Sequence, residues 1–183
     1  DGFELGIGIL FPFNKDAAER DMMVNTVAPV WDGNETWLVL GGAALYGAFP
    51  LAYAVILDAL SVPLTLMLIG LIFRGVAFEF RFKATEVHRP FWDKSFIVGS
   101  FLATFSQGVV LGTFINGFEV TNRAYSGPEL LWLTPFSLFC GLGLVVAYAL
   151  LGSTWLIMKT ENELHPKMTA ITKPLLLVLL AII

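Results

Sequence analysis

Acidic side chains inside an apolar segment are the first feature of this sequence that could do chemistry. Asp1 and Glu4 lie three residues apart in the apolar segment 1–13, so a helix would place them on one face. If that helix ends near residue 13, Glu4 lies about 13 Å from its end. A carboxyl group at that depth should be protonated or paired. It serves as a hydrogen-bonded structural acid, as a station for proton transfer or as a contact with a partner.

A second polar cluster lies just before the next long apolar segment, and its members are Trp31, Asp32, Gly33, Asn34 and Glu35. Asp32 can act as a helix N-cap, because a carboxylate accepts hydrogen bonds from backbone N–H groups two or three residues further on. Glu35 would then complete a capping box. A hydrated carboxylate at the mouth of a helix can also exchange protons with water. Both roles are open for Asp32, and they do not exclude each other.

One basic residue, Arg74, falls inside an apolar segment that ends near Arg81. The spacing places it about 10 Å inside that end. Its side chain can snorkel to the membrane surface, or it can pair with a carboxylate or with an anionic group of a neighbouring subunit or cofactor. Arg74 and Glu79 are candidate structural or subunit-interface residues, as are Trp31, Gly33 and Asn34.

Several common reaction centres are missing from the sequence. The only histidines, His88 and His165, fall in predicted loops, so neither can ligate a haem inside the bundle. The methionines show no paired arrangement, and Cys140 is the only cysteine. No phosphate-binding loop, CxxC, HExxH or GxSxG motif is present. The sequence therefore predicts no metal site, no haem ligand and no catalytic residue in this chain.

The composition indicates which elements must hold these residues. The chain has 183 residues, of which 56% are hydrophobic and 14% charged, whereas a soluble domain has about 25% charged residues. It cannot cover its own surface with polar groups, which excludes a soluble enzyme and predicts an integral membrane protein in contact with lipid. The net charge of −4 argues against nucleic acid as a partner.

Hydropathy predicts an all-α fold, a polytopic bundle of transmembrane helices in a single domain, 1–183. A span needs about 20 apolar residues, so about six spans are expected, the first and last incomplete, in an interior fragment of a longer subunit. A short interfacial helix is expected over 16–27. The complete spans are 36–57, 60–80, 95–116 and 134–158, and the partial ones are 1–13 and 174–183.

Basic residues are divided unequally between the two sides of the predicted bundle. Loops 14–35, 81–94 and 159–173 carry nine Lys or Arg residues, whereas the loops on the other side carry only Arg123. Because loops rich in Lys and Arg stay on the cytoplasmic side, these three loops are predicted to be cytoplasmic. The nine residues are Lys15, Arg20, Arg81, Lys83, Arg89, Lys94, Lys159, Lys167 and Lys173.

Three segments make the sequence resemble a known family. They are the run DGFELGIG over 1–8, the P-x-W-D-G-N motif that begins at Pro29, and the run FRGVAFEFR over 73–81. In order and spacing they resemble subunit II of the bd-type quinol oxidases, and this Phe-rich variant is closer to the cyanide-insensitive branch. The resemblance extends over the whole chain, which corresponds to about half of such a subunit.

This resemblance implies a respiratory complex of the prokaryotic cell membrane that oxidises quinol and reduces oxygen to water. It implies haems bound by a partner, subunit I, and a haem-free subunit II that supports it and helps to bring cytoplasmic protons to the oxygen-reducing haem. Asp32 matches the family's carboxylate at the proton mouth, and Asp1 and Glu4 match acids of the first helix. Relatives often carry Asp in place of Glu4 and Pro in place of Gly75.

Two other classes of function are open. A proton-coupled secondary transporter would also use intramembrane acids, but it should show broken helices and an internal repeat, and neither is clear in this sequence. A membrane scaffold without a proton role is the third alternative. Haem absorption and quinol-dependent oxygen uptake by the purified complex would distinguish the three.

Overall fold

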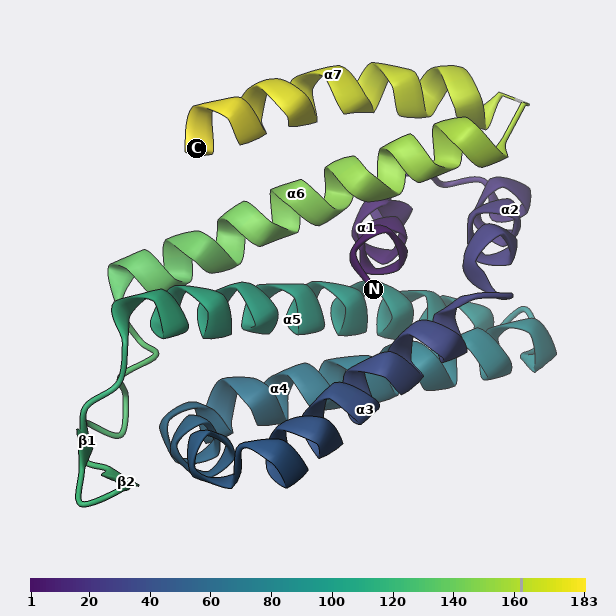
Figure 1. Cartoon of the computed structure of the whole chain (residues 1–183). Helices are drawn as coiled ribbons and strands as arrows, with labels where there is room; N and C mark the ends of the chain where they lie inside the picture. Colours follow the sequence, from purple (N-terminus) through teal and green to yellow (C-terminus); the bar gives the residue numbers. More distant parts are fainter. Residues whose placement is uncertain (162) are drawn as a thin grey trace.

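The computed structural model describes residues 1–161 and 163–183, and it is almost entirely helical (Figure 1). The expected all-α fold is confirmed. Near the N-terminus are α1 (Gly2–Leu10), the 3-10 helix η1 (Phe11–Phe13) and α2 (Ala17–Val27). The longer helices are α3 (Trp31–Ala48), α4 (Pro50–Lys83), α5 (Arg89–Asn116), α6 (Pro135–Lys159) and α7 (Leu164–Ile182). A small hairpin of β1 (Val120–Thr121) and β2 (Ala124–Tyr125) joins α5 to α6.

Capping residues and prolines set the start of several helices. Asp16 begins α2, because its carboxylate accepts hydrogen bonds from the N–H groups of Ala18 (2.8 Å) and Glu19 (3.1 Å). The hydroxyl of Thr134 accepts from the N–H of Ser137 (3.1 Å) at the start of α6. In α4, α5 and α6 a proline stands in the first turn, where its missing N–H leaves no helical hydrogen bond unmade. The helix expected over 16–27 is therefore present as α2.

Four helices in the described part of the chain are long and apolar enough to cross a membrane, namely α4, α5, α6 and α7. α1 and η1 together form a shorter apolar helix, Gly2–Phe13, which corresponds to the expected partial span 1–13. α3 is not among the four, since its first two turns carry acidic and amide residues. Of the six or so spans expected, four therefore meet the criterion of length and hydropathy.

One expected span, 36–57, is wrong as a single helix. α3 ends at Ala48, and α4 begins at Pro50 and runs on through the predicted gap between the two spans. Pro50 suits the first turn of a helix, where no N–H is needed, and it disfavours helical angles at the residue before it, so Phe49 is non-helical (φ −134°, ψ 60°) and separates α3 from α4. Leu60 has non-helical angles (φ −120°, ψ 16°) close to Pro63, which gives a kink where a loop was predicted.

The predicted loop 159–173 is also mostly helical, because α7 already begins at Leu164. Its first turns are amphipathic. Leu164 and Met168, four residues apart, are buried in the core, whereas the polar residues between them face outward. Hydropathy averaged over a window misses such a segment, because the polar face lowers the mean.

Small residues let the helices approach closely. A methyl group added to Gly70 of α4 would lie 2.7 Å from the carbonyl oxygen of Gly99 in α5. One added to Gly6 of α1 would lie 1.8 Å from the carbonyl oxygen of Tyr148 in α6. Such contacts bring backbones together in membrane bundles. α3, in contrast, lies beside α4 and buries none of its residues (Figure 1).

The connections alternate between the two ends of the bundle. Figure 1 shows α2, the α4–α5 turn, the end of α6 and the start of α7 at its right-hand end, and the β1–β2 hairpin at its left-hand end. The loops predicted to be cytoplasmic thus share one end, and Arg123 lies in the hairpin at the other. Which of the two ends faces the cytoplasm stays a prediction.

Candidate functional site

Arg74 of α4 lies at the centre of a buried charge network that joins α1, α3 and α4. Its side chain is 0% exposed and pairs with two carboxylates. Nη2 donates to Oε2 of Glu4 at 3.0 Å, and Nη1 donates to Oε1 of Glu35 at 2.5 Å. The side-chain amide of Asn34 donates to the other oxygen of Glu4. Arg74 is therefore paired inside the protein and does not snorkel to the surface.

Aromatic rings line one side of this network. The guanidinium carbon of Arg74 lies 5.2 Å from the ring centre of Phe78, within the range of a cation–π interaction. Trp31 of α3 stacks on Phe78, with ring centres 5.0 Å apart and planes at 9°. Trp31 thus joins the first turn of α3 to α4 beside the charges.

The network contains one guanidinium group for two carboxylates. With both acids ionised its formal charge is −1, which one added proton would neutralise. An uncompensated buried charge is costly. Binding of one proton or another cation would remove that cost. Glu4 is 0% exposed, whereas the side chain of Glu35 is 22% exposed. Glu35 is therefore the acid of this network that is accessible from outside the protein.

A groove of about 420 Å³ between α3 and α4 leads to the network. Asp32 and Glu35 both line it, and their spacing places them on one face of α3. Asp32 is exposed, Glu35 is half-buried and Glu4 is buried. The three carboxylates thus form a series from the surface to the interior.

Asp32 does not cap α3, so one of its two predicted roles is wrong. The helix already begins at Trp31, and its N-cap residue, Val30, makes no side-chain hydrogen bond. Asp32 lies in the first turn, where a carboxylate interacts favourably with the helix dipole. Glu35 bonds to Arg74 and does not complete a capping box. The proton-exchange role of Asp32 stays a prediction.

The other predicted residues lie outside the Arg74 network. Glu79 is exposed and pairs with Lys83 of the next turn at 3.4 Å. Gly33 is exposed, and nothing lies within 4 Å of a methyl group added to it. Asp1 is partly buried, and among the described residues its Oδ1 has no hydrogen-bond partner.

A second charge network, which the sequence did not reveal, joins α2, α4 and α5. Arg81 is 1% exposed, and its guanidinium group bonds to Asp93 and to Asp21, each at 2.5 Å. Arg20 bonds to the second oxygen of Asp93 at 2.8 Å. Arg89 bonds to both oxygens of Asp21, at 2.5 and 2.6 Å. These pairs fix α2 to the α4–α5 pair.

The arginines of this second network change the titration of Asp21. Burial alone would raise the pKa of this carboxyl group, but the hydrogen bonds and charges of Arg81 and Arg89 outweigh burial, so its pKa lies below the usual value. Asp21 is therefore ionised at neutral pH, and the attachment of α2 persists there.

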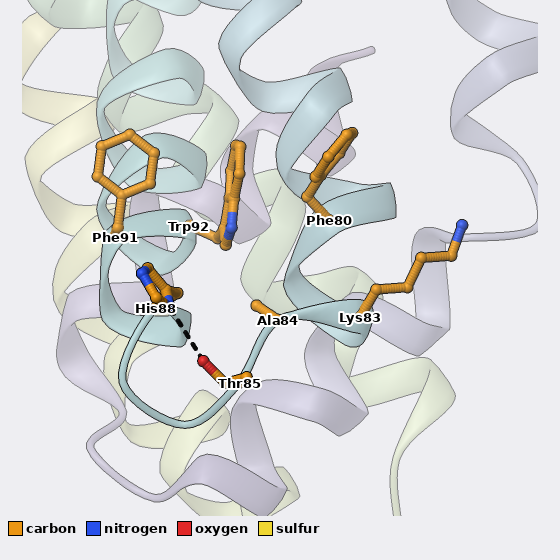
Figure 2. Close-up of a pocket in the computed structure, with 7 residues that line it drawn as sticks. All are labelled: Phe80, Lys83, Ala84, Thr85, His88, Phe91 and Trp92. Carbon is orange, nitrogen blue, oxygen red and sulfur yellow. Dashed lines mark hydrogen bonds between the residues drawn. The ribbon is translucent and has the colours of Figure 1, made fainter.

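The residues that could bind a metal are scattered. In residues 1–161 and 163–183, no three His, Cys, Asp or Glu side chains are grouped so that they could hold an ion. His88 stands at the α4–α5 turn, where its Nδ1 lies 2.9 Å from the hydroxyl of Thr85 (Figure 2). His165 is in the first turn of α7 and is exposed. Both histidines are exposed in this structure.

These features define a class of protein. A bundle of apolar helices that encloses an arginine between carboxylates from two other helices is a polytopic membrane protein with a charged interior, and such charges commonly mark proton or ion pathways. The chain belongs to the cytochrome bd terminal oxidase subunit II family, whose model matches residues 1–183. The resemblance to this family that the sequence indicates is therefore confirmed.

Curated relatives carry matching names. The chain is 37% identical over 172 residues to cytochrome bd-I ubiquinol oxidase subunit 2 of Escherichia coli K12, which covers 90% of this chain and 45% of that protein. It is 34% identical over 180 residues to the probable cytochrome oxidase subunit 2 of Haemophilus influenzae, and the match covers 94% of this chain and 48% of that protein. It is 37% identical over 122 residues to cytochrome bd ubiquinol oxidase subunit 2 of Bacillus subtilis, and the match covers 66% of this chain and 36% of that protein. The chain thus spans about half the length of the first two relatives.

Proposed function

We propose that this chain is part of a subunit II that joins a haem-bearing subunit I in a bd-type quinol:oxygen oxidoreductase of the bacterial cell membrane. In that complex it supports the haem-bearing subunit and helps to take up cytoplasmic protons for oxygen reduction. Family membership and the relatives named as ubiquinol oxidase subunits support the complex. The buried network of Glu4, Glu35 and Arg74 is the observation that carries the proton role.

Haems belong to subunit I in this proposal, and this chain ligates none. When bound there they carry electrons from quinol to oxygen. The chain's own residues move protons and contact the partner. α3 is a candidate for that contact, because it exposes apolar side chains such as Trp37 and Val39, each 71% exposed.

The proposed route begins at Asp32, where an exposed carboxylate exchanges protons with water. Glu35, on the same face of α3 and in the same groove, receives the proton next. Arg74 holds Glu35 and Glu4 on one guanidinium group, so a proton on either acid changes the charge balance at the other. Beyond Glu4, the next acid is Asp1, the N-cap residue of α1, three residues before Glu4.

Amide substitutions of the two outer acids test this route. Asp32→Asn and Glu35→Gln keep the shape of the side chain but cannot carry a proton. We expect each to slow quinol-dependent oxygen reduction by about a hundredfold, the lower range for loss of a proton-transferring group, with haem content near that of the wild type. Because Asp32 does not cap α3, Asp32→Ala should resemble Asp32→Asn. Glu86→Gln, which removes an exposed acid from the α4–α5 turn, is the matched control.

The outcome separates the proton role from assembly. Full turnover of a well-assembled Asp32→Asn complex would refute the relay. If oxygen reduction instead falls in proportion to haem content, the acids serve assembly, as the scaffold alternative requires. Proton uptake after an oxygen pulse, measured with a pH indicator, should be slowed in both amide variants and not in the control.

A further inference from the structure

A pocket and a groove lie end to end on one face of the α4–α5 pair, outside the two charge networks. The pocket, about 510 Å³, lies at the α4–α5 turn (Figure 2). The groove, about 300 Å³, lies further along the same two helices. Phe91 lines both. From His88, the N-cap residue of α5, the lining positions 91, 95, 98 and 102 follow helical spacing, so they form one continuous stripe.

The groove is apolar and open to the surroundings. Its floor lies where Gly70 and Gly99 bring the two backbones into contact. The hydroxyl of Ser95 is already bonded to the carbonyl oxygen of Phe73 at 3.1 Å. The walls include Phe73 and Val98, which are 50% and 61% exposed. Lys94, an exposed cation, lines the end of the groove that is nearer the turn.

The pocket at the turn has aromatic walls and a polar rim. Figure 2 shows the rings of Phe80 and Trp92 side by side, with ring centres 5.1 Å apart. Phe91 packs edge-on against Trp92, also at 5.1 Å. Thr85 and His88, which hydrogen-bond to each other, close the pocket at the turn. Aromatic rings beside polar groups are typical of the membrane–water interface.

We propose that this face binds an anionic phospholipid, with its phosphate group at Lys94 and the pocket rim and one acyl chain in the groove. From residue 91 to residue 102 the groove extends about 16 Å along α5, which matches the depth of one leaflet, about 15 Å. Lys94 lies at the end of the groove that is nearer the α4–α5 turn, where the headgroup of the lipid would bind. The cytoplasmic leaflet, which the α4–α5 turn is predicted to face, is the anionic one.

The dimensions favour a lipid chain over a helix of another protein. A volume of 300 Å³ over about 16 Å gives a mean cross-section of about 19 Å². A helix with its side chains is about 10 Å across, so its cross-section is roughly four times larger. One hydrocarbon chain can therefore lie along the whole groove, whereas a helix could insert only single side chains into it.

Native mass spectrometry of the purified complex in detergent tests the proposal, with phosphatidylglycerol and phosphatidylcholine as probes. The wild type should retain phosphatidylglycerol in preference to phosphatidylcholine. Lys94→Gln should weaken phosphatidylglycerol binding about fivefold, as expected for one basic residue at an anionic surface. Val98→Phe fills the groove from an exposed position and should abolish retention. Lys173→Gln is the control, because Lys173 is exposed on α7 and lines neither the pocket nor the groove.

A second readout uses Trp92 in the pocket wall. Phosphatidylglycerol with brominated acyl chains should quench part of the tryptophan fluorescence of the complex, and that part should be missing in Trp92→Phe and in Val98→Phe. Equal phosphatidylglycerol retention in the wild type, Lys94→Gln and Val98→Phe overturns the proposal. Loss of subunit assembly in Val98→Phe, with no phospholipid retained by the wild type, also overturns it and assigns the groove to a partner protein.

Discussion

Removal of the guanidinium group of Arg74 tests the buried network most directly. Arg74→Leu strands Glu4, which is 0% exposed, and Glu35, whose side chain is 22% exposed. Breaking a buried ion pair costs about 3–5 kcal/mol, because the remaining charge has no partner. Glu4 accounts for most of this cost, since water solvates part of Glu35. For a domain of this size the loss corresponds to a fall in Tm of about 6–20 °C.

Thermal stability of the assembled complex in detergent, followed by size-exclusion chromatography after heating, measures this fall. Adding Glu4→Gln to Arg74→Leu removes the stranded charge, so the double variant should melt above the single one. Lys83→Leu removes an exposed cation from the same helix and should shift Tm by less than about 2 °C. An Arg74→Leu complex as stable to heat as the wild type would refute the reasoning.

Three further predictions concern pH, topology and haem. Because the pKa of Asp21 is lowered, its contribution to stability is complete above the unfolded value of 3.8 and is lost as pH falls through the folded value. Thermal stability should therefore fall more steeply below about pH 4 in the wild type than in Asp21→Asn, and equal slopes would contradict the role of this network. In a Cys140→Ser background, an impermeant thiol reagent applied to intact cells should label a cysteine at position 123 and not one at position 88; the reverse pattern overturns the orientation. The chain expressed alone should lack stoichiometric haem in a pyridine haemochrome assay, and one haem per chain would contradict the proposal that subunit I holds them all.

Hydropathy located the helices well where an apolar run is uninterrupted. The expected spans 95–116 and 134–158 fall almost entirely within α5 and α6. It failed where a proline restarts a helix inside an apolar run, as at Pro50, because mean hydropathy does not register a missing N–H. It also failed at the start of α7, where burial of one face decides the structure.

The site was only partly predictable for a related reason. The cost of a charge in an apolar environment marks Glu4 and Arg74 in the sequence alone. Glu35, the other acid bonded to Arg74, is 39 residues from it in sequence. Its spacing from Asp32 fits a capping box, so only the packing of α3 on α4 identifies Glu35 as a member of the network. Hydropathy places Arg81 in a loop. Its spacing of two helical turns from Arg74, which places both on one face of α4, was the signal for the second network.

The shared guanidinium group also has a consequence for how this family can diverge. Glu4, Asn34, Glu35 and Arg74 each bond to at least one of the other three, so replacing any one changes what the others must supply. Effects of substitutions within such a contacting set are not additive. Exchanging Glu4 for Asp withdraws the carboxylate from Arg74 and Asn34 together, and a longer side chain at a neighbouring position can restore the contact. Positions 4, 34, 35 and 74 should therefore change in concert during evolution, with each substitution acceptable only in the background that its neighbours create.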